Sequence, residues 1–290
     1  MGLDYAFRQS LSPMARMACA IVSKIREEER GTVWTKEYED SLAKTTDGDM
    51  YPGMMFTLAK ERMEKTKLWD IVRRMPKGSL LHAHMDAMVD VDWLLEKALA
   101  TEGMHLRAGE PLCTPAALET ADISFAFAKY TPEADQQIWS PQYKPSTLVA
   151  VTAAAESFPN GGKSGFLAWL KGRCTITSHE SLNHQQGPNA VWHKFASTFP
   201  IINSIMFYEP IYRASIQKIL EELSEDGVRW VEFRLAFVFD YRRDGCKVPE
   251  EGYVECMKVF ADEVRKFKNT EKGEGFWGAR SVITFLVGHL

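Results

Sequence analysis

The last third of the chain alternates between strand and helix patterns, and this order restricts the fold more than any other feature. Residues 228–237 and 279–287 have the composition of strands, and residues 253–267 between them carry an apolar stripe at helical spacing. Two strands that are joined through a helix are expected to pair in parallel, because the helix carries the chain back along the sheet. The sequence therefore predicts an α/β fold.

Side chains alternate along the predicted strand at residues 228–237. Apolar residues fall mainly on one face and polar ones on the other, as in a barrel strand with helices outside and polar groups within. The first face carries Val231, Phe233, Leu235 and Phe237, and the second carries Trp230, Glu232 and Arg234. We interpret Glu232 and Arg234 as an interior ion pair rather than as catalytic groups.

The sharpest signal for chemistry is the segment Leu-His-Ala-His-Met-Asp at residues 81–86. It ends an apolar run that begins at Ser79 and is typical of a short buried strand. Side chains two positions apart on a strand point the same way, so His82, His84 and Asp86 are predicted to share one face. Two converging neutral imidazoles bind zinc well, and a catalytic site adds further protein ligands and an open position for water. A chance His-x-His pair is the alternative, which the preceding strand and the following carboxylate disfavour.

A break at residues 75–78, Met-Pro-Lys-Gly, separates this strand from the residues before it. Helical patterns upstream predict an N-terminal helical extension over residues 1–74, and a second domain is expected over residues 75–290. Within that domain, residues from about 101 to 172 carry six prolines and no sustained periodicity. We expect a loop-rich insertion there.

Charge and cysteine usage exclude several classes of protein. The net charge is −4, and Lys and Arg are dispersed among Asp and Glu, so no nucleic-acid partner is predicted. No apolar run approaches the length of a membrane span, and Arg16 interrupts the apolar stretch at residues 14–22, so neither a membrane anchor nor a signal peptide is expected. The five cysteines lie far apart and form no CxxC pair. These features together favour a cytoplasmic protein.

Several segments resemble the zinc-dependent adenosine deaminases. Residues 75–84, Met-Pro-Lys-Gly-Ser-Leu-Leu-His-Ala-His, closely match the motif with which adenosine and AMP deaminases open their barrel. Residues 32–35, 51–56 and 191–195 resemble the secreted, growth factor-related branch of that family. The resemblance covers nearly the whole chain and is weakest within the insertion.

This resemblance implies a partial (β/α)8 TIM-type barrel, with about three of the eight strands that a closed barrel needs. It implies that His82 and His84 bind zinc, that Asp86 contacts a ribose and that Trp192 lies near the substrate pocket. The implied reaction is the hydrolytic deamination of adenosine, or of a related nucleoside, to inosine. The N-terminal extension implies a possible homodimer, and the secreted branch implies an extracellular location as the alternative to a cytoplasmic one.

The family completes its site with a third zinc histidine, a His-x-Gly-Glu segment, another histidine and an aspartate on later strands. Residues 1–290 carry only the first part of this set, so we expect a weak or incomplete zinc site and a catalytically incomplete chain. Three hypotheses follow: a zinc-dependent adenosine aminohydrolase, a non-catalytic dimerisation or interaction module, and a truncated gene product.

Overall fold

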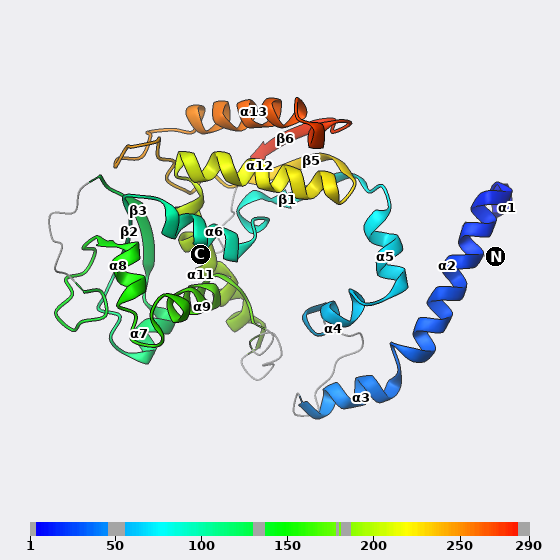
Figure 1. The fold of residues 1–290 in the computed structure, drawn as a ribbon, viewed down its shortest axis with the longest axis horizontal. Helices are drawn as coiled ribbons and strands as arrows, with labels where there is room; N and C mark the ends of the chain where they lie inside the picture. Colours follow the sequence, from blue (N-terminus) through cyan, green and yellow to red (C-terminus); the bar gives the residue numbers. More distant parts are fainter. Residues whose placement is uncertain (1–3, 46–55, 130–136, 178–179, 181–186, 284–290) are drawn as a thin grey trace. The chain divides into compact units, whose positions relative to one another are not determined.

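The computed structural model divides into two compact units, Met1–Met75 and Pro76–Leu290, and each is described by itself (Figure 1). Among the described helices, none has the length and apolar composition that crossing a membrane requires. The described residues are 4–45, 56–129, 137–177, 180 and 187–283.

The first unit is helical, as the sequence indicated. Its helices are α1 (Tyr5–Ser10), α2 (Pro13–Thr32), α3 (Lys36–Thr45), α4 (Phe56–Met63) and α5 (Lys67–Arg74). The Ser12 hydroxyl caps α2 by accepting from the amide of Ala15, and Thr66 caps α5 in the same way. The buried carboxylate of Glu29 in α2 accepts the backbone amide of Leu68 at 3.1 Å, which joins α2 to the first turn of α5.

One face of α2 remains exposed. Met14, Met17 and Ile21 are 82%, 66% and 54% exposed and lie three and four positions apart, so they form one stripe. Exposed apolar stripes of this kind mark contact surfaces more often than isolated exposed side chains do.

The second unit contains the predicted parallel sheet. Its strands are β1 (Gly78–His84), β5 (Val228–Leu235) and β6 (Gly278–Ile283), in the order β1-β5-β6 with both pairs parallel. Helix α12 (Glu209–Glu225) precedes β5, and α13 (Val254–Lys268) connects β5 to β6. The predicted α/β class and the parallel pairing are therefore confirmed.

The predicted alternation in β5 is also confirmed. Val231, Phe233 and Leu235 are at most 2% exposed, and the Phe233 ring meets Phe260 of α13 edge-on with centroids 5.8 Å apart. The other face of β5 is only partly buried. The helices thus cover one face of the sheet and leave the polar face more accessible.

Residues 101–172 hold more regular structure than their prolines indicated. Strands β2 (Met104–Ala108), β3 (Ile123–Phe127) and β4 (Val149–Ala150) form an antiparallel sheet in the order β3-β2-β4. The helices here are α7 (Pro115–Thr120), α8 (Val151–Glu156) and α9 (Gly162–Cys174). The number of prolines was a poor indicator of loops here. Pro115, for example, begins a helix, where its missing amide hydrogen has no partner to lose.

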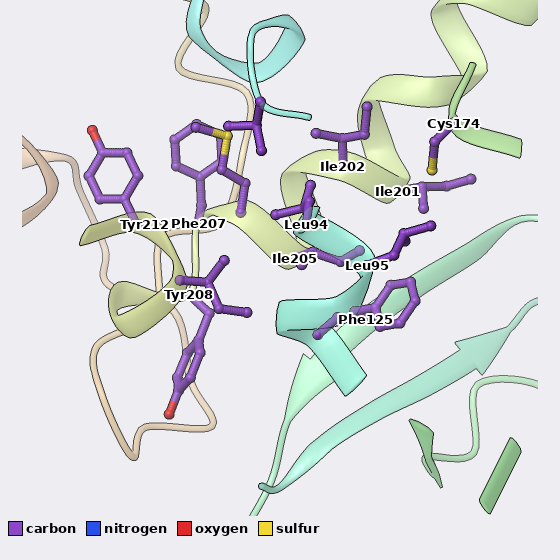
Figure 2. Packing of buried hydrophobic residues seen from close by; sticks show 14 of the residues in the cluster. Leu94, Leu95, Phe125, Cys174, Ile201, Ile202, Ile205, Phe207, Tyr208 and Tyr212 are labelled. Carbon is purple, nitrogen blue, oxygen red and sulfur yellow. The ribbon is translucent and has the colours of Figure 1, made fainter. Parts of the chain in front are cut away.

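A continuous core links this antiparallel sheet to the end of β1. It is built around η1 (Met85–Ala87), α6 (Val91–Ala100) and α11 (Gly187–Met206). Elsewhere in this unit, a short turn, η3 (Glu271–Gly273), precedes β6. Figure 2 shows side chains of α6, β3 and α11 packed together. They include Leu94, Leu95, Phe125, Ile201, Ile202 and Ile205. Helix α11 therefore spans from the antiparallel sheet to the turn that follows the histidine pair.

Candidate metal and nucleoside site

The carboxyl end of β1 departs from regular pairing just before the two histidines. Leu80 is paired with Val231 and Ala83 with Phe233, so three steps along β1 face two steps along β5. The extra residue is a β-bulge, a feature that re-aims side chains and is common beside active sites. The strand was expected to be buried throughout, but Leu81 is 58% exposed and His82 is also exposed.

The two imidazole rings lie side by side. The ring centroids of His82 and His84 are 5.4 Å apart and the ring planes are inclined by 42°. Two imidazoles bound to one tetrahedral zinc ion at a Zn–N distance of about 2.0–2.1 Å have centroids about 5 Å apart. The spacing of this pair therefore fits a shared metal ion.

Asp86 does not lie on the same strand face as the histidines, which corrects the sequence prediction. The strand ends at His84, and the chain turns into η1, which contains Asp86. Burial raises the pKa of the Asp86 carboxyl, and its backbone hydrogen bond, the neighbouring His84 and a hydrogen bond from Asn203 oppose this shift. The carboxyl group thus remains close to His84, although it comes from a different element.

Asn203 of α11 is a site neighbour that the sequence did not indicate. Its side chain hydrogen-bonds to Asp86, and its own Oδ1 atom is buried without a hydrogen-bond partner among the described residues. No local pattern marks Asn203, because it meets Asp86 only through the packing of α11 against η1.

Trp192 is on the same helix but far from this cluster. It precedes Asn203 by eleven residues, which is about 16 Å along a helix axis. Its side chain is 64% exposed and lies beside Phe195, with ring centroids 5.7 Å apart. No described contact joins Trp192 to the histidine pair.

The expected ion pair between Glu232 and Arg234 is wrong. Glu232 pairs with Arg280 of β6, its register partner, at 3.2 Å. The Nη2 atom of Arg234 instead donates to the backbone carbonyl of Leu81 in the bulge, also at 3.2 Å. The physical reason is spacing: residues two apart on a strand are about 6.6 Å apart, whereas register partners on neighbouring strands are about 4.8 Å apart.

Among the described residues, no group of three or more His, Cys, Asp or Glu side chains is arranged to hold a metal ion. The five cysteines are free thiols, and burial raises the pKa of Cys174 and of Cys256 to about 12. Such thiols are largely protonated at neutral pH, whereas metals bind the thiolate. The candidate site is thus the histidine pair, with Asp86 beside it.

No family model matches the chain. It is 26% identical over 227 residues to a protein named adenosine deaminase from Phlebotomus duboscqi. It is also 27% identical over 219 residues to adenosine deaminase 2 of Homo sapiens, and 28% identical over 238 residues to adenosine deaminase 2 of Sus scrofa. These alignments cover 78%, 76% and 82% of this chain, but only 40%, 39% and 43% of the relatives. The chain therefore spans about two fifths of the length of the curated relatives that it matches.

These similarities support a relationship of the chain to the adenosine deaminase family, and the parallel α/β sheet with a histidine pair at the end of its first strand is compatible with it. The similarity to adenosine deaminase 2 proteins of several vertebrates supports the growth factor-related branch.

Proposed function

We propose that His82 and His84 are two ligands of a zinc ion, at the start of a (β/α)8 barrel of which β1, β5 and β6 are three strands. The observation that carries this proposal is the 5.4 Å spacing of the two rings at the carboxyl end of a parallel strand. Barrel enzymes carry their active sites at that end of the strands. Zinc lowers the pKa of a water that it binds toward neutrality, which suits a hydrolytic reaction.

Asp86 is proposed to contact the ribose of adenosine or of a related nucleoside. An ionised carboxylate accepts hydrogen bonds from sugar hydroxyls, and Asn203 and His84 both favour the ionised form of Asp86 against the effect of burial. Trp192 is proposed to lie at the outer edge of the nucleoside pocket. Its exposed ring can stack on a purine, and it is distant from the two histidines along α11. Hydrolytic deamination of adenosine to inosine is the reaction proposed for a protein of the relatives' full length.

Zinc content tests the metal assignment directly. The purified 290-residue chain is equilibrated with zinc, passed over a desalting column and analysed by atomic emission. We expect bound zinc in the wild type, easily removed by a mild chelator because two imidazoles and one carboxylate make a short ligand set. The variant His82→Ala/His84→Ala should lose this zinc, and the control His193→Ala, an exposed histidine of α11, should keep it. Equal zinc in the double variant would refute the assignment.

A non-catalytic interaction module is the second candidate, and the exposed stripe of α2 favours it. Under this proposal residues 1–74 are the dimerisation part, with Met14, Met17 and Ile21 in contact with a second copy. Light scattering coupled to size-exclusion chromatography should then show a dimer that Met17→Glu dissociates. A monomer in the wild type would exclude this candidate.

An extracellular location is proposed in preference to the cytoplasmic one. The similarity to adenosine deaminase 2 supports it, because the resembled branch is the secreted one. Immunoblots of medium and cell lysate distinguish the two locations.

A further inference from the structure

We propose that Arg234 is a positioning residue for the histidine pair, since its guanidinium holds the β1 bulge in the form that sets His82 beside His84. This inference rests on the proposed function, because zinc binding requires the two histidines to be held in a fixed arrangement. Its structural part, the control of ring orientation by Arg234, can be tested without any metal.

Arg234 contacts β1 within the bulge itself. The bulge lies between Leu80 and Ala83, and it contains Leu81 and His82. A bulge disrupts the ladder of backbone hydrogen bonds locally, so the backbone there needs another source of order. The Nη2 atom of Arg234 donates to the carbonyl of Leu81, at 3.2 Å, within this irregular segment. That carbonyl immediately precedes His82, so fixing it restricts the backbone that carries the first imidazole.

The register of β1 and β5 also places Arg234 beside the second histidine. Arg234 is the register partner of His84, so the two side chains leave neighbouring strands on the same face. One arginine therefore contacts the backbone before the first histidine and flanks the second. Among the described residues, no other side chain donates a hydrogen bond to the backbone of the bulge.

Among the described residues, no carboxylate pairs with Arg234. Its neighbour on the same face, Glu232, is paired with Arg280 instead. The Nε atom of Arg234 is buried and has no hydrogen-bond partner within the described part of the chain. An ion pair would by itself account for the position of an arginine side chain. Among the described residues, Arg234 instead makes its polar contact with the bulge.

The test uses the full 290-residue chain without metal. Imidazole signals are followed by proton–carbon correlation NMR and assigned with His82→Ala and His84→Ala. In Arg234→Met, which keeps the length of the side chain but has no donor, we expect the signals of both histidines to shift, with His105 and His193 unchanged. Glu232→Gln is the matched control, since it removes a charge from the same strand face and should leave the pair unmoved. The proposal would be overturned if the histidine signals of Arg234→Met coincided with those of the wild type. It would also be overturned if Glu232→Gln shifted these signals as much as Arg234→Met does.

Zinc affinity, measured by competition with a chelator, gives a second readout. Residues that orient metal ligands typically change metal affinity by about 10–100-fold, so Arg234→Met should bind zinc about tenfold more weakly than the wild type. Arg234→Lys keeps a donor and should recover part of that loss. If Arg234→Met shows no cooperative unfolding transition, Arg234→Leu, which also lacks a donor, replaces it with the same expected results. Zinc binding that ignores the two histidines refutes the proposed function, while unmoved imidazole signals refute the role of Arg234.

Discussion

In the described part of the second unit, the parallel and the antiparallel sheet have three strands each but differ in how far helices and loops cover them. In the antiparallel sheet, Leu106 of β2 is fully buried and Phe125 of β3 is 1% exposed. In the parallel sheet, the helices α12 and α13 cover one face, while Leu81 of β1 is 58% exposed. An apolar groove of about 840 Å³ also lies between α13 and β6, lined in part by Phe237, Met257 and Ile283.

Within this unit, the antiparallel sheet contributes mainly to stability, whereas the parallel sheet carries the candidate site. Side chains that hold the antiparallel sheet together are almost fully out of water, where each contributes most to the free energy of folding. His84 is the register partner of Arg234 on the more accessible face of the parallel sheet, and Asp86 lies beside it in η1. The antiparallel region is therefore expected to tolerate core substitutions poorly, and the parallel sheet to tolerate substitutions on its open face well.

The largest effect should come from the antiparallel core. Phe125→Ala removes a buried ring and is expected to lower the free energy of unfolding by about 3–5 kcal/mol, because transfer and cavity terms add. Leu81→Ala, on the open face of the parallel sheet, should change it by about 0.5 kcal/mol or less. Urea unfolding followed by tryptophan fluorescence measures both. Similar losses in the two variants would break the comparison.

An intermediate effect is expected at the helices that cover the parallel sheet. Glu263 of α13 is 2% exposed and accepts hydrogen bonds from Arg213, Gln217 and Lys266 at 2.7–2.8 Å. Burial opposes its ionised form, but these three partners outweigh burial and hold the pKa of Glu263 below its usual value. Glu263→Gln should cost about 2 kcal/mol, the range of hydrogen bonds to charged groups.

The pH dependence follows from the same carboxylate. A folded-state pKa below the unfolded value stabilises the protein above the unfolded pKa of about 4.3, and this stability is lost as the pH falls through the folded pKa. Unfolding midpoints measured from pH 7 down to pH 3 should therefore decline less steeply in Glu263→Gln than in the wild type. Parallel curves would show that Glu263 is not the group responsible.

The smallest effect concerns the corrected ion pair. Glu232 and Arg280 form a pair whose arginine side chain is 62% exposed, so their coupling should be about 0.5 kcal/mol and should weaken with added salt. A double-mutant cycle with Glu232→Gln and Arg280→Met measures it. The matched cycle of Glu232→Gln with Arg234→Met should give a coupling near zero, and the reverse order of the two couplings would restore the original expectation.

Elements whose signals are local were predictable. The alternation in β5 and the proximity of His82 and His84 both depend on spacings of a few residues, and the structure has each of them. Register between strands is set instead by contacts across the fold, so the sequence did not indicate that Arg280 is the partner of Glu232.

The candidate site was predicted only in part for the same reason. The bulge in β1 depends on pairing with β5, and the turn that carries Asp86 off the strand depends on packing beneath α11. Asn203 comes from a helix more than a hundred residues further along the chain, so no local pattern connects it with Asp86. The sequence did not predict the antiparallel sheet, because its strands are short and β4 has only two residues.

The bulge between Leu80 and Ala83 also has a consequence for protein engineering. A designer who copies the His-Ala-His tripeptide onto a regular strand of another scaffold transfers the side chains but not the extra position. On a regular strand the two imidazoles would still share one face, because side chains alternate with a period of two, but the irregular backbone that precedes the second histidine would be absent. A transplanted motif needs residues 80–84 as a block, together with an arginine from the neighbouring strand.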